Sequence, residues 1–299
     1  MPHPGWTDFC FDGIGTRWEI STPAALSAGQ RRRLLDVVAE YDAAWSRFRP
    51  DSLISGAARQ PGRYELPAGA ASLGRLYRTL YRLSGGAMTP LIGASLERLG
   101  YDAGYSLQPA GSPLPAPPWE EVLEWHGTVL TTTAPVLIDV GAAGKGQLVD
   151  LLSAELRAAG ISEHFIDASG DLLNSGPGEG PVAGGAAAVE VALEHPYDPG
   201  RAIGIVSLGP GALCASAANR RAWGDGLHHV LDGTTGAPVR TVVASWAMAG
   251  TAMVADALAT ALFFVDARRL RAEFDFSWLT VYSDGHAEYS EDFEGALFS

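Results

Sequence analysis

Cysteine is scarce in this 299-residue chain, which contains only Cys10 and Cys214. Two cysteines so far apart cannot form a framework of several disulfides, and their spacing does not match a structural zinc site. Long hydrophobic runs are also missing, because no apolar segment approaches the roughly 18 residues that a membrane-spanning helix needs. The first residues lack both the basic start and the apolar core of a secretory signal. The sequence therefore predicts a cytoplasmic protein that does not bind membranes.

Positive charge is in short supply as well. The chain has 21 Lys and Arg residues against 34 Asp and Glu residues, which gives a formal net charge of −13. This excess opposes nonspecific binding to nucleic acid. An anionic ligand would need local compensation from a lysine, a helix N-terminus or a divalent cation. The hydrophobic content of 47% is enough for a large core and gives no sign of disorder.

The most informative stretch is residues 136–150, VLIDVGAAGKGQLVD. Residues 136–140 form an apolar run that predicts a buried strand, and leucines four residues apart then predict a helix that ends near Gly160. The glycines between them let backbone amides approach an anion, while the helix start and Lys145 add positive charge. This junction predicts a phosphate-binding turn.

Two common phosphate-binding motifs do not fit these residues. A P-loop needs a glycine five residues before the Gly-Lys pair and a Ser or Thr after it, but Asp139 and Gly146 occupy those positions. The Gly-x-Gly-x-x-Gly order of a dinucleotide fingerprint is also absent. Taken alone, the segment has a plain alternative, a strand-to-helix turn with a solvated lysine.

Residues 139–150 resemble the Asp-Leu-Gly-Gly-Ile-Ala-Lys-Gly-Tyr-Ala-Val-Asp signature of the ApbE-type FAD:protein FMN transferases, a flavin-binding family. Other segments resemble motifs of this family in the same order, and the resemblance covers about residues 11 to 265. These segments are Ile14-Gly15-Thr16, residues 41–55, residues 86–93, Gly170-Asp171, residues 215–223, residues 228–238 and residues 255–263.

The resemblance implies a set of residues around the flavin ligand. They are Gly15, Thr16, Met88, Thr89, Gly141, Ala142, Lys145, Gly170, Asp171, Ser216 and His229. Met88 and Thr89 stand where the family usually has Phe and Asp, and Ala215 and Ala217 replace a Thr and a Gly beside Ser216. Gly233 stands where proline is usual.

A metal site is predicted in the apolar helix expected over residues 251–265. Asp256 and Thr260 lie four residues apart there and so share one face. A buried carboxylate needs a partner, and Mg²⁺ accepts carboxylate, hydroxyl, carbonyl and phosphate oxygens. The resemblance implies that both residues bind Mg²⁺, with a backbone carbonyl near Gly144 as a further ligand. An aspartate that only caps a helix or accepts a hydrogen bond is the alternative.

Two adjacent histidines precede the Asp232-Gly233 turn. A histidine with an ordinary pKa of about 6.5 can accept a proton at neutral pH, so His229 is a candidate base for a hydroxyl nucleophile. The alternative is that it only hydrogen-bonds the turn. His228 is predicted to face outward, because neighbouring residues of a strand point in opposite directions.

These features predict a transferase in which Lys145, His229 and Asp256 are catalytic. Mg²⁺ and Lys145 would hold the pyrophosphate of FAD, a Thr or Ser hydroxyl of a client protein would attack the FMN-side phosphorus, and AMP would leave. A flavin-binding or sequestering protein without transfer activity is one alternative. An Mg²⁺-dependent FAD hydrolase that gives FMN and AMP is another.

Helical patterns alternate irregularly with runs of strands, which predicts an α+β fold with mixed, largely antiparallel sheets flanked by helices. The resemblance implies two fused lobes with the ligand cleft between them. By composition, the proline-rich residues 109–118 could divide two domains. The resemblance runs across them on both sides, which implies a surface loop within one flavin transferase-like domain of residues 1–299. A homodimer stays an open alternative.

Local patterns predict further elements. These are a helix with a Ser27–Gln30 capping box, a helix over residues 70–84, strands over residues 11–20, 188–194 and 202–208, a strand that enters a tight turn within residues 165–173, and a hairpin at Asp284-Gly285.

Overall fold

An antiparallel sheet of eight strands is the largest element of the computed structural model, which describes residues 5–176 and 188–298. Its strand order is β1-β2-β6-β7-β10-β13-β14-β15. The strands are Thr7–Gly13 (β1), Thr16–Thr22 (β2), Phe165–Asp167 (β6), Asp171–Asn174 (β7), Gly211–Ala217 (β10), Val242–Ala249 (β13), Ser277–Tyr282 (β14) and Ala287–Tyr289 (β15). Residues 1–4, on which the predicted lack of a signal partly depends, lie outside the described residues.

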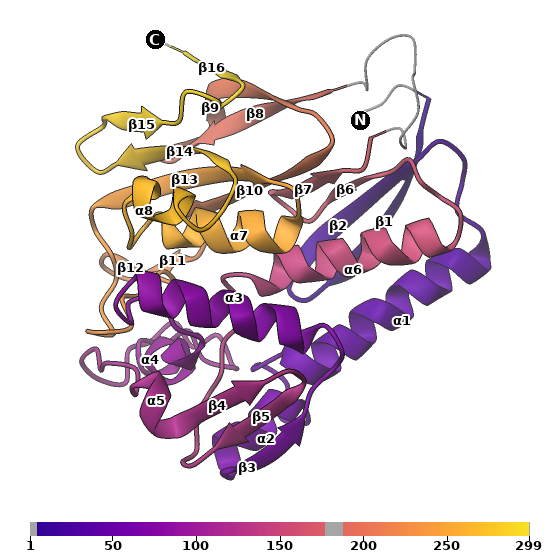
Figure 1. The fold of residues 1–299 in the computed structure, drawn as a ribbon. Helices are drawn as coiled ribbons and strands as arrows, with labels where there is room; N and C mark the ends of the chain where they lie inside the picture. The colour runs from indigo at the N-terminus through magenta and orange to yellow at the C-terminus, as the bar shows by residue number, and fades with distance from the viewer. Residues whose placement is uncertain (1–4, 177–187, 299) are drawn as a thin grey trace.

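Smaller sheets lie at both ends of the molecule (Figure 1). One contains Val189–His195 (β8), Asp198–Leu208 (β9) and Gly295–Leu297 (β16), and another contains Gly62–Glu65 (β3), Leu123–His126 (β4) and Val129–Thr132 (β5). The short strands Ala222–Trp223 (β11) and Leu227–His228 (β12) pair with each other. All strand pairs among the described residues are antiparallel.

The helices lie mostly below the large sheet in Figure 1, and some of them pack against it directly. They are Ala28–Trp45 (α1), Leu53–Arg59 (α2), Ala70–Leu83 (α3), Gly93–Arg98 (α4), Trp119–Val122 (α5), Gly144–Ala158 (α6), Ala252–Ala261 (α7) and Ala267–Arg271 (α8), with a 3-10 turn at Pro90–Ile92. Figure 1 shows α6 and α7 between the large sheet and α3. The predicted α+β fold with largely antiparallel sheets flanked by helices is confirmed.

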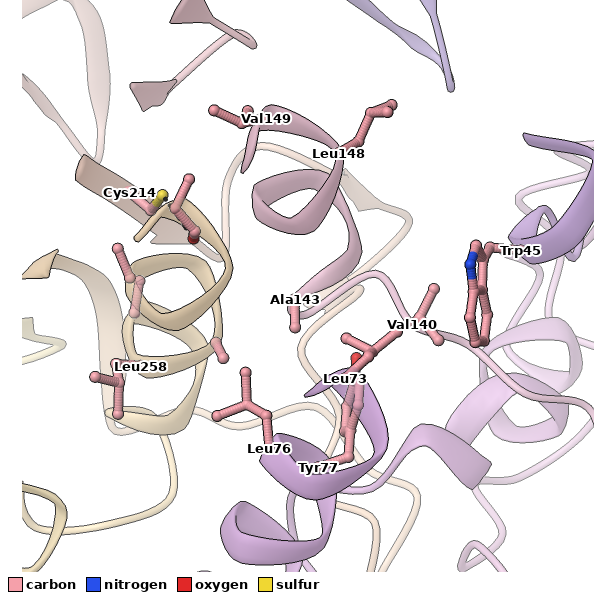
Figure 2. Packing of buried hydrophobic residues seen from close by; sticks show 14 of the residues in the cluster. Trp45, Leu73, Leu76, Tyr77, Val140, Ala143, Leu148, Val149, Cys214 and Leu258 are labelled. Atoms are coloured by element: carbon pink, nitrogen blue, oxygen red, sulfur yellow. Dashed lines mark hydrogen bonds between the residues drawn. The ribbon is translucent and has the colours of Figure 1, made fainter. Parts of the chain in front are cut away.

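The buried core joins the central helices to the segment that precedes α6. In Figure 2, Val140 and Ala143 lie between Leu76 and Tyr77 of α3 and the helices α6 and α7. Both residues are almost fully buried, with exposed fractions of 6% for Val140 and 0% for Ala143. The glycine turn therefore begins from a rigid apolar support, which fixes the direction in which α6 starts.

Several predicted elements are confirmed. Ser27 and Gln30 form the capping box of α1, because the Ser27 side chain accepts from the Gln30 amide and Gln30 Oε1 accepts from the Ser27 amide. The predicted helices over residues 70–84 and 251–265 correspond to α3 and α7, and the predicted C-terminal hairpin is formed by β14 and β15. The strands predicted over residues 188–194 and 202–208 correspond to β8 and β9.

The strand predicted over residues 136–140 is wrong. Val136, Ile138 and Val140 of this segment are buried, but among residues 5–176 and 188–298 the segment pairs with no strand. Instead, the Val136 amide donates to the Ala57 carbonyl at 3.1 Å, and the Asp139 amide donates to the Pro90 carbonyl at 2.8 Å. Irregular partners satisfy its backbone, so an apolar pattern typical of a sheet arises in a buried connection.

The prediction of a single strand over residues 11–20 is also wrong, because the chain turns back within this segment. β1 and β2 form a hairpin in which Gly13 pairs with Thr16. The two residues of the turn have left-handed backbone angles, with φ of 43° at Ile14 and 79° at Gly15. Ile14 is β-branched and strongly disfavours this geometry, which explains why the sequence pattern did not predict a turn there.

Among residues 5–176 and 188–298, no helix is both long enough and apolar enough to cross a bilayer.

A buried histidine on this scaffold leads to a prediction about pH. His164 is fully buried, with Nδ1 3.1 Å from the Ile161 carbonyl oxygen and Nε2 2.8 Å from Ser153 Oγ. Burial lowers its pKa from 6.5 to about 4. The unfolded chain therefore takes up the proton first, so the stability contributed by neutral His164 is lost as the pH falls from about 6.5 toward 4.

We expect His164 to lower the free energy of unfolding by about 2 kcal/mol between pH 7 and pH 5. Urea unfolding across this range would show a flatter pH dependence in His164→Gln than in the wild type. The same substitution at the exposed His126 is the control and should keep the wild-type slope. Equal slopes in the wild type and His164→Gln would contradict the prediction.

Candidate functional site

The predicted phosphate-binding turn leads directly into α6. The Val140 carbonyl accepts hydrogen bonds from the amides of Ala143 and Gly144, and no side chain caps the helix at Ala143. Two residues after Gly144, the Gly146 amide donates to Asp256 Oδ2 of α7 at 2.9 Å. The start of α6 is therefore held against α7 by a carboxylate from that helix.

Gly146 allows this close approach because it has no side chain. A Cβ atom at this position would collide with the Ala252 carbonyl oxygen and would lie 2.8 Å from Asp256 Cβ. Backbone atoms cannot move aside as a flexible side chain can. The glycine that follows Lys145 thus serves the contact between the two helices.

The ammonium group of Lys145 contacts a carboxylate and a backbone carbonyl. Its Nζ lies 3.2 Å from Asp171 Oδ2 and donates to the Ala168 carbonyl at 3.0 Å. Burial alone would lower the pKa of Lys145, but the carboxylates of Asp171 and Asp256 raise it. Lys145 is therefore a charged group at neutral pH, which contradicts the alternative of a solvated lysine, since only 22% of its side chain is exposed.

Two buried carboxylates share this single lysine. Asp256 is 4% exposed and Asp171 is fully buried, and burial raises the pKa of both. Asp171 adds to the shift at Asp256 through its negative charge. The positive charge of Lys145, 3.2 Å from Asp171 Oδ2, offsets part of the upward shift of the Asp171 pKa. Lys145 can balance only one of these two carboxylates in its ionised form, so a cation bound beside Asp256 would favour ionisation of the other.

The residues beside Asp256 fit a hard cation. Thr260 Oγ1 lies 2.9 Å from Ser216 Oγ, so two hydroxyl oxygens stand next to the carboxylate of α7 on the wall of one cavity. In the described part of the chain no group of three or more His, Cys, Asp or Glu side chains could hold a metal ion. Oxygens from a ligand or the backbone would have to complete the shell, as is usual for Mg²⁺ at phosphates.

These groups face a cavity of about 330 Å³, which we call the lysine cavity. Most of the residues predicted from sequence line it together. They are Gly15, Thr16, Met88, Thr89, Gly141, Ala142, Lys145, Gly170, Ser216, His229, Asp256 and Thr260. Asp171 lies behind the wall as the partner of Lys145, and Gly144 does not line this cavity.

A second cavity of about 540 Å³, the aromatic cavity, adjoins the first. The two share six lining residues, Gly15, Tyr101, Asp139, Gly141, Lys145 and Arg221. Gly144 lines the aromatic cavity, together with the rings of Trp45, Phe48, Tyr101, Tyr105 and Trp223. An elongated ligand with an anionic centre and planar ends could therefore occupy both cavities.

Sequence reasoning missed an ion pair in the shared wall. Arg47 Nε lies 2.6 Å from Asp139 Oδ2, and the guanidinium carbon lies 4.2 Å from the Phe48 ring centroid and 4.8 Å from that of Tyr101. Burial alone would raise the pKa of Asp139, but Arg47 and the Gly141 amide hold it below its usual value. Asp139 and Arg47 both lie in segments that resemble the family, which is the signal that could have identified them.

Two expectations about the histidines are wrong. Burial, with smaller contributions from Arg221 and His228, lowers the pKa of His229 to about 3, so the histidine does not have the ordinary pKa that the sequence suggested. Its Nδ1 is buried and has no hydrogen-bond partner among the described residues. His228 does not face outward, because it is 8% exposed and its Nε2 donates to the Val239 carbonyl at 2.8 Å. The segment after the turn covers it.

Backbone strain is concentrated around the two cavities. Within the described chain, four residues other than glycine have left-handed φ angles, namely Ile14, Tyr105, Leu107 and Ser169. The first three line the aromatic cavity and Ser169 lines the lysine cavity. Such strain clusters at functional sites, so its position here supports the hypothesis that these cavities have a function.

Sequence comparison finds relatives of most of this chain. The model of the ApbE family matches residues 14–275. The chain belongs to the ApbE family. An FAD:protein FMN transferase of Rhodobacter capsulatus is 30% identical over 265 residues, which cover 83% of this chain but 49% of that relative. An FAD:protein FMN transferase of Treponema pallidum is 27% identical over 271 residues, covering 81% of this chain and 72% of the relative. The chain thus spans about half the length of the first relative.

Solved ApbE structures share the fold. The ApbE protein of Thermotoga maritima superposes with a TM-score of 0.82 at 24% identity, covering 97% of this chain and 99% of that chain. The flavin transferase ApbE of Vibrio cholerae gives a TM-score of 0.75 at 21% identity, covering 96% and 98%. At these identities the superpositions establish the α+β architecture of this ApbE-family chain.

Proposed function

We propose that this ApbE-family protein transfers FMN from FAD to a Thr or Ser hydroxyl of a client protein, with release of AMP and dependence on Mg²⁺. One observation carries the proposal. Lys145 comes from α6, and Asp256 and Thr260 come from α7, yet all three line the lysine cavity beside the N-terminus of α6. A cation site and a fixed ammonium group on one wall suit a pyrophosphate. The names of the curated relatives support the same activity.

The donor set fits Mg²⁺, with Asp256 and Thr260 as its protein ligands. When bound, the ion would supply neutralisation of the negative charge that develops on the departing phosphate. The sequence predicted the Gly144 carbonyl as a further ligand, and this ligand stays part of the proposal. Gly144 lines the adjoining aromatic cavity and does not line the lysine cavity. Lys145 would hold the phosphate oxygens, and the aromatic cavity would accept one ring system of FAD.

In the proposed reaction the client oxygen forms a bond to the FMN-side phosphorus. The bond between this phosphorus and the bridging oxygen breaks, and AMP leaves with the electron pair. His229 lines the same cavity and would accept the hydroxyl proton. Its pKa of about 3 makes it a weak base in the free protein. An adjacent phosphate anion favours the charged imidazolium, so FAD binding would raise this pKa toward a catalytically useful range.

The proposal is tested with the purified protein, FAD, Mg²⁺ and extract of cells that express the chain. We expect a flavin-fluorescent band that survives denaturing electrophoresis, a phosphoester on Thr or Ser by mass spectrometry, and one AMP released for each flavin attached. Free FMN and AMP without a covalent product would show a hydrolase instead. FAD that is bound but unchanged would show a flavin-sequestering protein. Either of these two results would overturn the proposal.

A further inference from the structure

The groups of the proposed site are divided between two helices. Lys145 is on α6, while Asp256 and Thr260 are on α7. The distance between the ammonium group and the cation ligands therefore depends on how these helices are held together. In Figure 1 they lie side by side beneath the large sheet, and their residues are in contact.

Asp150 ties the two helices together without lining either cavity. It lies in the second turn of α6, and its carboxylate reaches the start of α7. Oδ1 accepts from the Ala252 amide and Oδ2 accepts from the Met253 amide, each at 2.9 Å. These are the first two residues of α7, whose amides have no partner within their own helix. One side chain of α6 therefore satisfies two amides of α7.

A second carboxylate makes the reciprocal contact. Asp256 of α7 accepts from the Gly146 amide near the start of α6 at 2.9 Å. Each helix thus supplies an aspartate to the N-terminal amides of the other. The two contacts lie at Gly146 and Asp150, one helical turn apart on α6, so together they limit both sliding and rotation of α7.

We propose that Asp150 is a positioning residue of the flavin-transfer site, which sets the location of Asp256 and Thr260 relative to Lys145. Its consequence for turnover rests on the proposed function, whereas the tie between the helices does not. Both carboxylate oxygens are needed as acceptors. Asparagine has one acceptor oxygen, and its NH₂ group would face the second amide as donor against donor.

The test compares Asp150→Asn with Thr251→Ala. Thr251 caps the same helix, since its Oγ1 accepts from the Val254 amide at 3.4 Å, but this bond lies within α7. Amide exchange followed by NMR is the first readout. We expect exchange of Gly146 to be at least tenfold faster in Asp150→Asn, because loss of one tie loosens the other. In Thr251→Ala we expect Gly146 to keep the wild-type rate.

Binding of Mn²⁺ in the presence of ADP, measured by EPR, is the second readout. We expect its affinity to fall about 10- to 100-fold in Asp150→Asn and less than twofold in Thr251→Ala. Unchanged Gly146 exchange in Asp150→Asn would overturn the inference, since Asp150 would then act only as a local cap. A wild-type protein that does not bind Mn²⁺ with ADP would overturn the metal part of the proposed function, and Gly146 exchange would still decide the role of Asp150.

Discussion

Asp256→Asn is expected to reduce the rate of flavin transfer by about 10³. The substitution keeps the shape of the side chain and leaves an oxygen that can accept from the Gly146 amide, so the contact between α6 and α7 can persist. It removes the charge that would hold the cation. An interaction of a metal with developing phosphate charge is worth several kcal/mol, and about 1.4 kcal/mol corresponds to a factor of ten. Initial rates measured over a range of Mg²⁺ concentrations would show this loss.

A matched control separates this effect from the loss of any acidic cap. Asp266 is exposed and its side chain accepts from the Arg268 amide at the start of α8. Asp266→Asn should transfer flavin at the wild-type rate with the wild-type Mg²⁺ dependence. If the wild type works at full rate in EDTA, or if Asp256→Asn retains normal Mg²⁺ dependence, the assignment of Asp256 as a metal ligand is wrong.

Gly146→Ala is expected to destabilise the contact between α6 and α7 strongly. The added methyl group would meet the Ala252 carbonyl oxygen and Asp256 Cβ, neither of which belongs to a flexible side chain end. The helices would have to separate, at a cost of about 3 kcal/mol in the free energy of unfolding. A displacement of Asp256 by about 1 Å should lower the rate of flavin transfer about 10²-fold. Denaturant midpoints and transfer rates measure the two effects.

Gly29→Ala provides the control for this experiment. Gly29 lies in the first turn of α1, and a Cβ there would have no atom within 4 Å. Alanine favours a helix over glycine, so this variant should be as stable as the wild type or more so. If Gly146→Ala unfolds at the same denaturant concentration as Gly29→Ala, a methyl group fits between α6 and α7, and the predicted destabilisation is wrong.

The sequence predicted best those features that depend on local chemistry. The capping box of α1 and the boundaries of α3 are confirmed, because caps and glycine stops act over a few residues. The resemblance to ApbE motifs also brought together residues from distant segments that do line one cavity, such as Thr16, Thr89 and Ser216. Motif order carries this information because the family shares one fold.

Features that depend on the tertiary environment could not be predicted. An apolar run at residues 136–140 looks the same whether its amides pair with a strand or, as here, with single carbonyls of Ala57 and Pro90. The pKa of His229 depends on burial and on Arg221, neither of which is visible in the local sequence. The pairing of Arg47 with Asp139 joins residues 92 positions apart. Long-range contacts of this kind are set only by the complete fold.

The left-handed residues around the two cavities have a meaning for how such a sequence can change. Each non-glycine residue in this geometry costs about 1 to 3 kcal/mol, which is a large share of the 5 to 15 kcal/mol that stabilises an ordinary domain. Glycine at Ile14, Tyr105 or Leu107 would relieve the backbone but remove a side chain from the rim of the aromatic cavity. Folding stability therefore favours glycine at these positions, whereas ligand recognition favours the present side chains. We expect a relative with glycine at these positions to bind the ligand more weakly.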